Sequence, residues 1–151
     1  MKIYIASDHR GVLLKNKIIK HLMAKKILVN EVSIINNEND DYPDFAFAVC
    51  QKVLEDDTNL GILLCGNGIG MSIAANKVKG IRAIRAVDEL DCYNGKNHNG
   101  ANILCIGSNL DEELVKTMVD TFINTPNPNE ERHIKRINKI IKYENGEYNA
   151  L

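Results

Sequence analysis

An alternation of two kinds of segment constrains the fold of this chain most strongly. Five short runs rich in Val, Ile and Leu, which predict strands, are separated by longer stretches whose apolar residues recur at helical spacing. The runs cover residues 3–6, 27–32, 60–65, 81–86 and 102–107. A helix is predicted after each run, and one more helix follows near the C-terminus. This order predicts an α/β fold: a three-layer sandwich in which a five-stranded parallel sheet has helices on both faces and an extra C-terminal helix.

The character of the individual segments refines this prediction. The run at 60–65 is apolar throughout, which predicts a strand buried on both faces, whereas the run at 27–32 is less apolar and predicts a strand near an edge. A polar loop is expected at residues 36–41. Helices are expected at about residues 43–55, 70–78 and 88–97.

Length and composition limit the classes of protein that fit. The 151 residues contain no internal repeat, low-complexity segment or linker, so we expect one domain over residues 1–151. A formal charge of −1 excludes the sequence-wide basic field that nucleic-acid binding requires. No apolar run approaches the roughly 20 residues of a membrane helix. Polar residues at 7–10 interrupt the start of the chain too early for a signal peptide.

The four cysteines, Cys50, Cys65, Cys92 and Cys105, have no regular spacing. No pair forms a CxxC motif and no HExxH motif is present, so neither a disulfide scaffold nor a metal site is expected. Free thiols in a reducing cytoplasm are the better interpretation.

Polar residues follow the first predicted strand, at the edge of the sheet where ligands bind in folds of this kind. Asp8 and His9 place a carboxylate beside an imidazole, a pair that can move protons or bind hydroxyls. A helix N-cap at Asp8 and a solvated His9 would explain the same residues without any function. The local sequence alone favours that simpler interpretation.

A glycine-rich loop, CGNGIG at residues 65–70, follows the third predicted strand. Its glycines fall at every second position, so it matches neither the dinucleotide-binding motif nor a Walker loop. The backbone N–H groups of Gly68 and Gly70 are candidates to bind a developing oxyanion. The dipole of the following helix favours the thiolate form of Cys65. A buried structural cysteine at the end of a strand is the alternative.

Two further groups of polar residues lie nearer the C-terminus. His98 and Asn99 precede the fifth predicted strand in an expected loop, where a lone histidine is usually only solvated. Arg132, His133 and Arg136 share one side of the last predicted helix, a cationic arrangement that suits an anion such as phosphate. The alternative is a solvated face neutralised by the two preceding glutamates.

Several of these segments also occur, in the same order, in a known family. They are Ser7-Asp8-His9, Tyr42-Pro43-Asp44-Phe45-Ala46, Cys65-Gly66, GIGMSIAANK at residues 68–77, Gly80-Ile81-Arg82-Ala83, His98-Asn99, Arg132-His133 and Arg136. Over almost its whole length, the chain resembles the family of ribose-5-phosphate isomerase B and the galactose-6-phosphate isomerase subunits. The run at 68–77 is the most distinctive of these motifs.

The resemblance implies an enzyme without metal or cofactor that interconverts aldose and ketose phosphates on a Rossmann-like sheet. It assigns Cys65 as the base that removes the proton beside the carbonyl, and His98 as the acid that opens the sugar ring or donates a proton. The substrate-contacting positions are Asp8, His9, Tyr42, Gly66, Asn67, Gly68, Ile69, Gly70 and Asn99, and the phosphate-binding positions are Arg132 and Arg136, with His133 beside them. We therefore expect reversible conversion of D-ribose 5-phosphate to D-ribulose 5-phosphate, in the pentose phosphate pathway.

Three positions depart from the family pattern. Asn67 stands where Thr is usual, Asn109 where many members have Arg, and Val87 where His is common. The first two leave the choice of substrate open. One alternative is an isomerase of a six-carbon sugar phosphate, galactose 6-phosphate or allose 6-phosphate. The other is a non-catalytic sugar-phosphate-binding subunit, which the presence of Cys65 and His98 disfavours.

The predicted topology separates the two residues that are assigned to catalysis. Cys65 follows a strand and His98 precedes one, so they lie at opposite edges of a parallel sheet, roughly 17–20 Å apart for strands of about five residues. If His98 works with Cys65, it must come from a neighbouring chain, unless the segment at 95–101 extends back toward the other edge. We therefore expect a homodimer, or a dimer of dimers, with active sites shared between subunits.

Overall fold

The strands and helices alternate along the chain as the sequence predicts. The structure is a computed structural model, and it describes residues 1–32, 36–149 and 151. Its strands are β1 (Ile3–Ser7), β2 (Val29–Glu31), β3 (Leu60–Cys65), β4 (Ala83–Arg85) and β5 (Ile103–Gly107). Its helices are the short 3-10 helix η1 (His9–Gly11) and the α-helices α1 (Val12–Ala24), α2 (Tyr42–Val53), α3 (Ile69–Ala75), α4 (Glu89–Asn99), α5 (Glu112–Asn124) and α6 (Glu131–Glu144).

The strands form one parallel sheet in the order β2-β1-β3-β5-β4. The central strand β3 pairs with β1 and β5, so that Ile62 lies between Ile5 and Leu104. Every residue of β3 is buried, whereas the three-residue strands β2 and β4 form the edges. The predicted fold class, the buried central strand and the edge position of the 27–32 run are therefore confirmed.

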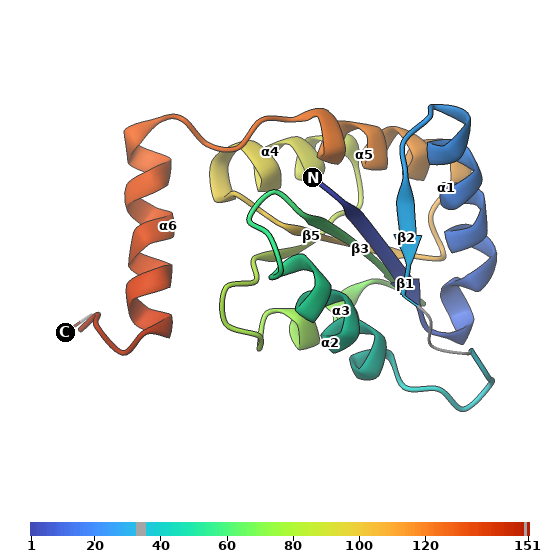
Figure 1. The fold of residues 1–151 in the computed structure, drawn as a ribbon, viewed down its shortest axis with the longest axis horizontal. Coiled ribbons are helices and arrows are strands. Elements are labelled where there is room, and N and C mark those ends of the chain that lie inside the picture. The colour runs from blue at the N-terminus through green and yellow to red at the C-terminus, as the bar shows by residue number, and fades with distance from the viewer. Residues whose placement is uncertain (33–35, 150) are drawn as a thin grey trace.

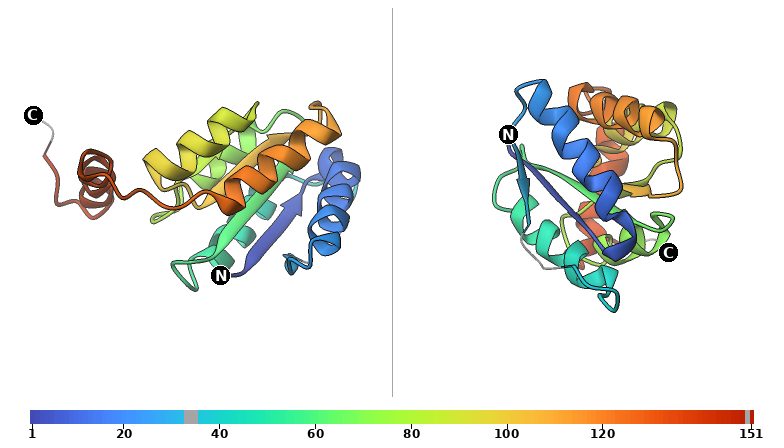
Figure 2. Two further views of the ribbon diagram at one scale, coloured as in Figure 1. Left: turned by 90° about the horizontal axis from the view of Figure 1, so that it is seen from above. Right: turned by 90° about the vertical axis from the view of Figure 1, so that its right-hand side faces the viewer.

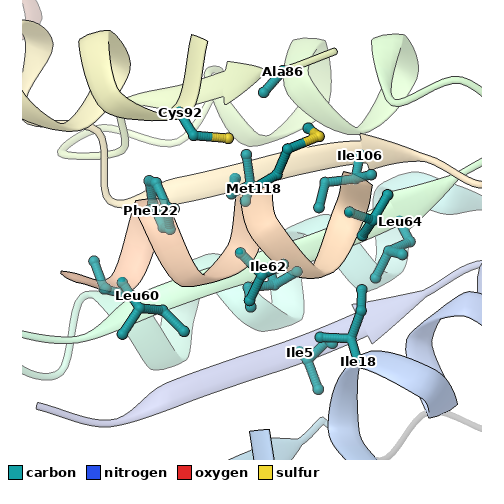
Figure 3. Close-up of a cluster of buried hydrophobic side chains, with 14 of the residues drawn as sticks. Ile5, Ile18, Leu60, Ile62, Leu64, Ala86, Cys92, Ile106, Met118 and Phe122 are labelled. Atoms are coloured by element: carbon teal, nitrogen blue, oxygen red, sulfur yellow. The ribbon is translucent and has the colours of Figure 1, made fainter. Parts of the chain in front are cut away.

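Helices cover both faces of this sheet (Figure 1). On one face α1, α4 and α5 pack on an apolar cluster that includes Ile18, Ile62 and Phe122 (Figure 3). On the other face α2 and α3 bury Phe45 and Met71 against the strands. Full burial of each such side chain stabilises the fold by about 1.5–3 kcal/mol. With both faces covered by apolar layers, the two ends of the strands are left for polar chemistry.

Two helix boundaries differ from the predicted ones at candidate site residues. Helix α4 continues to Asn99 and ends at Gly100, whose φ of 60° is left-handed and favours glycine. His98 and Asn99 therefore lie in the last turn of α4, and the prediction of a loop there was wrong. Helix α3 begins at Ile69, one residue before the predicted start, because the backbone turns into it at Gly68.

Helix α6 lies at one end of the sandwich, where it contacts α4 and the Glu144 carboxylate accepts a hydrogen bond from the N–H of Gly80 (Figures 1 and 2). The extended segment 125–130, which contains two prolines, carries the chain away from α5. The apolar residues Ile134, Ile140 and Ile141 of α6 are 38–47% exposed. A single chain thus leaves an apolar face of α6 uncovered. Within the described residues, no helix is both long and apolar enough to cross a membrane.

Candidate active site

The carboxyl ends of β1 and β3 lie side by side and carry the first group of predicted site residues. The backbone N–H of Asp8 donates to the carbonyl of Leu64, 3.1 Å away, which places Asp8 close to the end of β3. The Asp8 carboxylate accepts a hydrogen bond of 3.0 Å from the N–H of Arg10, so the predicted helix cap at Asp8 is confirmed. Burial raises the pKa of Asp8, although this N–H and the nearby His9 ring act in the opposite direction.

Cys65 begins the glycine-rich loop and is 4% exposed. Its Sγ accepts a hydrogen bond of 3.2 Å from the backbone N–H of Gly68. Gly68 has a φ of 77°, and a Cβ there would lie 3.1–3.3 Å from the backbone at the end of β5, so glycine is required. This N–H is directed at the sulfur, which corrects the prediction that it binds an oxyanion. The N–H of Gly70, in the first turn of α3, has no acceptor among the described residues and is the remaining candidate.

Side chains hold the glycine-rich loop from two sides. The Asn67 side chain accepts a hydrogen bond of 3.1 Å from the N–H of Ile69 through Oδ1. Arg85, at the end of β4, donates from Nε to the backbone carbonyl of Asn67 at 2.9 Å. The loop is therefore fixed in front of the sheet edge, with its peptide groups in defined orientations.

Helix α2 brings Tyr42 over the same loop. Atoms of its ring would lie only 2.7–2.9 Å from a Cβ on Gly70, so the ring rests on this glycine. The ring of His9 is held nearby by Asp40, whose Oδ1 atom lies 2.7 Å from Nδ1. The carboxyl edge thus holds the predicted site residues Asp8, His9, Tyr42, Cys65, Gly66, Asn67, Gly68, Ile69 and Gly70.

Three residues at this edge were not predicted as part of the site: Arg10, Asp40 and Arg85. The guanidinium of Arg10 packs on the loop, with its central carbon 2.8 Å from where a Cβ of Gly66 would lie. Asp40 contacts His9, 31 positions away, and Arg85 contacts the loop 18 positions before it. No short motif marks such contacts, because each depends on the path of two distant segments.

The remaining predicted residues form a second group, on α4 and α6. The ring of His98 stacks on that of His133, with centroids 4.3 Å apart and planes inclined by 11°. His133 is 6% exposed, and its Nε2 atom is buried without a hydrogen-bond partner in the described part of the chain. Burial lowers the pKa of His133, and the neighbouring His98 and Arg132 lower it further. If a second subunit covered this group, the Nε2 atom of His133 would be available for a hydrogen bond across the interface.

The ends of α4 and α6 fix the other members of this second group. Arg132 donates from Nε to the carboxylate of Glu130 at 2.7 Å, so the neutralisation considered from the sequence is present for this residue. Arg136 lies one turn further along α6 and is exposed. The backbone carbonyl of Asn99 accepts a hydrogen bond of 3.1 Å from Nε of Arg82, which anchors the end of α4.

Within one chain the two groups lie at opposite ends of the strands. Cys65 pairs in register with Gly107, the last residue of β5, whereas His98 and Asn99 come shortly before Ile103, the first. Five residues of a parallel strand span about 17 Å. A cavity of about 460 Å³ lies at the amino edge, where its lining includes Arg82 and Lys96 but not Cys65. A single chain therefore does not bring Cys65 and His98 together.

The other three cysteines are also buried, and Cys105 lies in the same core cluster as Cys65. All four thiols are free. Burial raises the pKa of Cys50 and of Cys92 to about 12, and it also raises the pKa of Cys105 well above its ordinary value. These thiols stay protonated near neutral pH, as expected for packing residues. No group of three or more His, Cys, Asp or Glu residues suited to a metal ion occurs in the parts of the chain that are described.

Comparison with known proteins identifies the family of the chain. Residues 3–140 match the Ribose/Galactose Isomerase family. A probable ribose-5-phosphate isomerase B from Mycoplasma genitalium is 47% identical over 148 residues, which cover 94% of this chain and 95% of that protein. Ribose-5-phosphate isomerase B of Escherichia coli is 35% identical over 144 residues, with 95% and 96% covered.

The fold is shared with solved structures as well. The crystal structure of ribose-5-phosphate isomerase B from Mycoplasma genitalium, with bound ribulose-5-phosphate, has a TM-score of 0.90 and 43% sequence identity, covering 95% of this chain and 96% of that one. The structure of the Thermotoga maritima ribose 5-phosphate isomerase has a TM-score of 0.87 and 44% identity, with 93% and 97% covered. The expected family resemblance is thereby confirmed: this chain belongs to the ribose/galactose isomerase family.

Proposed function

We propose that this protein is an aldose–ketose isomerase that interconverts D-ribose 5-phosphate and D-ribulose 5-phosphate without a metal or a cofactor. The observation that carries the proposal is the thiol of Cys65 at the start of the glycine-rich loop, with the N–H of Gly68 directed at its sulfur. The thiolate is the reactive form of a cysteine, and a backbone N–H donates to the sulfur here. Family membership supports the reaction class, and the related Mycoplasma genitalium structure contains ribulose-5-phosphate.

The reaction needs one base and a set of fixed hydrogen-bond donors. In the proposed mechanism the Cys65 thiolate removes the proton from C2 of the open-chain aldose, and the C2–H electrons form the double bond of an enediolate. The former carbonyl oxygen then carries negative charge, which the N–H of Gly70 stabilises. The proton passes from Cys65 to C1. The proton of O2 moves to O1, so that O2 becomes the ketose carbonyl and O1 becomes the C1 hydroxyl. Asp8, His9 and Tyr42 bind hydroxyls of the sugar.

A second copy of the chain supplies the second group of site residues in this proposal. Its His98 opens the sugar ring, its Asn99 contacts the substrate, and its Arg132 and Arg136 bind the phosphate, with His133 beside them. The distance of about 17 Å between the two groups within one chain supports this arrangement. The uncovered apolar face of α6 fits a site that is completed on assembly. A two-fold homodimer exchanges these residues reciprocally, and a dimer of dimers preserves the same pairs.

A six-carbon sugar phosphate is the second candidate substrate, because of Asn109. The side chain of Asn109 packs against Gly107 at the end of β5, beside the backbone of the glycine-rich loop. An uncharged amide at this position leaves one less cation to select a substrate of a particular length. Galactose 6-phosphate and allose 6-phosphate are the compounds to compare.

The test is a panel of kcat/KM values for ribose 5-phosphate, galactose 6-phosphate and allose 6-phosphate, measured between about pH 6 and pH 9. We expect ribose 5-phosphate to be the preferred substrate and Cys65→Ala to abolish turnover. No conversion of any aldose phosphate would refute the proposal and favour a non-catalytic binding subunit. A larger kcat/KM for a six-carbon compound would instead select the second candidate.

We also propose that the enzyme works in the cytoplasm, as part of the pentose phosphate pathway. Four free thiols are compatible with a reducing compartment.

A further inference from the structure

The imidazole of His9 is held by a carboxylate from a distant loop. One oxygen of Asp40, Oδ1, accepts the backbone N–H of His9 at 2.9 Å and lies 2.7 Å from its Nδ1 atom. The Asp40 side chain is only 5% exposed, whereas that of His9 is 38% exposed. The ring is therefore fixed on its Nδ1 side and open on the other. Its Nε2 atom has no hydrogen-bond partner in the described ranges.

The second oxygen of Asp40 is also fully engaged. Oδ2 accepts hydrogen bonds from Nδ2 of Asn36 at 2.8 Å and from the N–H of Asn37 at 3.2 Å. Asn36 in turn donates from Nδ2 to the carbonyl of Ser7 at 2.8 Å, and its Oδ1 accepts a hydrogen bond from the Lys15 ammonium at 3.4 Å. The loop at 36–41 is thus bound to the end of β1 through its own side chains.

These hydrogen bonds keep Asp40 ionised. Burial by itself raises the pKa of the carboxyl, but the hydrogen bonds from Asn36, His9 and Asn37 outweigh it, and the pKa of Asp40 lies below its ordinary value. An ionised carboxylate only accepts hydrogen bonds. The proton of a neutral His9 ring must therefore reside on Nδ1, which leaves the lone pair on Nε2.

We propose that Asp40 is a positioning residue that fixes the tautomer and orientation of His9, so that Nε2 accepts a hydrogen bond from a hydroxyl of the sugar phosphate. The inference deepens the proposed function and rests on it. Free imidazole in water favours the opposite tautomer, with the proton on Nε2, which would present a donor to the substrate instead. Asp40 thereby decides whether His9 offers an acceptor or a donor.

Asp40 also lies two residues before Tyr42, whose ring rests on Gly70. Removal of Asp40 could therefore act through the position of Tyr42 rather than through His9. The two routes differ in one respect. An effect that passes through His9 disappears once His9 itself has been replaced, whereas an effect through Tyr42 persists.

The test combines nitrogen NMR of the His9 ring with kinetics of Asp40→Ala, in the parent and in a His9→Ala background. At about pH 8.5, where an ordinary imidazole is neutral, the parent should show the proton on Nδ1, and Asp40→Ala should shift it toward Nε2. Removing the partner that orients a metal-bound histidine costs roughly 10- to 100-fold in activity, and we expect a loss of kcat/KM in this range. In the His9→Ala background, the same substitution should change kcat/KM by less than about twofold.

Glu38→Ala is the matched control, because Glu38 is an exposed carboxylate on the same loop without a side-chain hydrogen bond to the described residues. It should leave both readouts unchanged. If Asp40→Ala does not fold, Asp40→Asn, which keeps the shape and removes the charge, gives the same readouts with smaller shifts. A parent ring protonated on Nε2, or an equal loss of kcat/KM with and without His9, would overturn the proposal.

The NMR measurement also separates this inference from the proposed function. If the parent converts no sugar phosphate, the proposed function fails, yet the tautomer of His9 still reports the action of Asp40. A separate titration adds ribose 5-phosphate to the Cys65→Ala variant. The Nε2 signal of His9 should move if this atom accepts a hydrogen bond from the sugar. An unmoved signal at saturating ligand would remove the role assigned to Nε2.

Discussion

Two inactive variants, damaged at opposite ends of the strands, should restore each other's activity when their subunits exchange. Cys65→Ala removes the proposed base at the carboxyl edge, and His98→Asn removes the proposed acid at the end of α4. About 17 Å of strand separates these positions within one chain, so no side chain bridges them. Each active site of the proposed homodimer therefore combines Cys65 of one subunit with His98 of the other.

The size of the recovery follows from this geometry. A mixed dimer has one site in which both substitutions meet and one site in which both residues are intact. Random pairing of equal amounts makes about half of the dimers mixed, and half of their sites work, so activity should return to about a quarter of that of the parent. Mixed dimers purified with two different affinity tags should reach about half.

The assay measures ribulose 5-phosphate formation before and after the two proteins are mixed under conditions that allow exchange. The matched control mixes Cys65→Ala with Asp8→Asn. Both of these positions lie at the same edge of one chain, so no intact site forms and no activity should return. If exchange is demonstrated by mass spectrometry and the first mixture stays inactive, His98 acts within its own chain and the shared site is wrong.

Three further predictions concern single residues. Gly70→Ala should lower kcat/KM about as much as Tyr42→Ala, because the added Cβ would lie 2.7–2.9 Å from the Tyr42 ring and displace it. Since Tyr42 is 39% exposed and its ring can swing outward, denaturant titration should detect a change of less than about 1 kcal/mol in the free energy of unfolding. Iodoacetamide should inactivate the enzyme by modifying Cys65, with protection by ribose 5-phosphate, and peptide mass spectrometry that places the inactivating label on another cysteine would contradict this. The pKa of His133 is lowered in the folded chain. As the pH falls through about 6.5, the unfolded state therefore binds more protons than the folded state, and the folded state loses stability. The midpoint of urea unfolding should fall between about pH 7 and pH 5.5, and it should fall less steeply in His133→Gln.

The fold could be predicted from the sequence because its periodicity is strong. The continuous apolar run of β3 requires burial on both faces, and the more polar β2 fits only an edge. The carboxyl-edge group followed from the same reasoning, since Asp8 and Cys65 each follow a strand of a parallel sheet. The sequence also predicted that His98 lies before β5, and topology alone then separated it from Cys65.

The contacts between distant side chains could not be predicted in this way. Asp40 reaches His9 only because the loop at 36–41 folds back on the end of β1, a path that hydrophobic periodicity does not encode. Arg85 belongs to an edge strand, where an exposed cation is usually only solvated, yet it binds the carbonyl of Asn67. The polar residues before Gly100 suggested a loop, whereas α4 continues through them to its left-handed cap at Gly100.

The central claim is that the isomerisation proceeds by proton transfer through Cys65 and an enediolate. It is tested most directly by following ribose 5-phosphate in heavy water by NMR until the reaction reaches equilibrium. Repeated removal and return of a proton exposes it to exchange with solvent, so deuterium should accumulate at C1 of ribulose 5-phosphate. Cys65→Ala should show neither conversion nor deuterium incorporation. A chelator should change neither the conversion nor the deuterium incorporation of the parent enzyme. Full conversion without deuterium at C1 would indicate a direct hydride shift between the two carbons and would contradict the account.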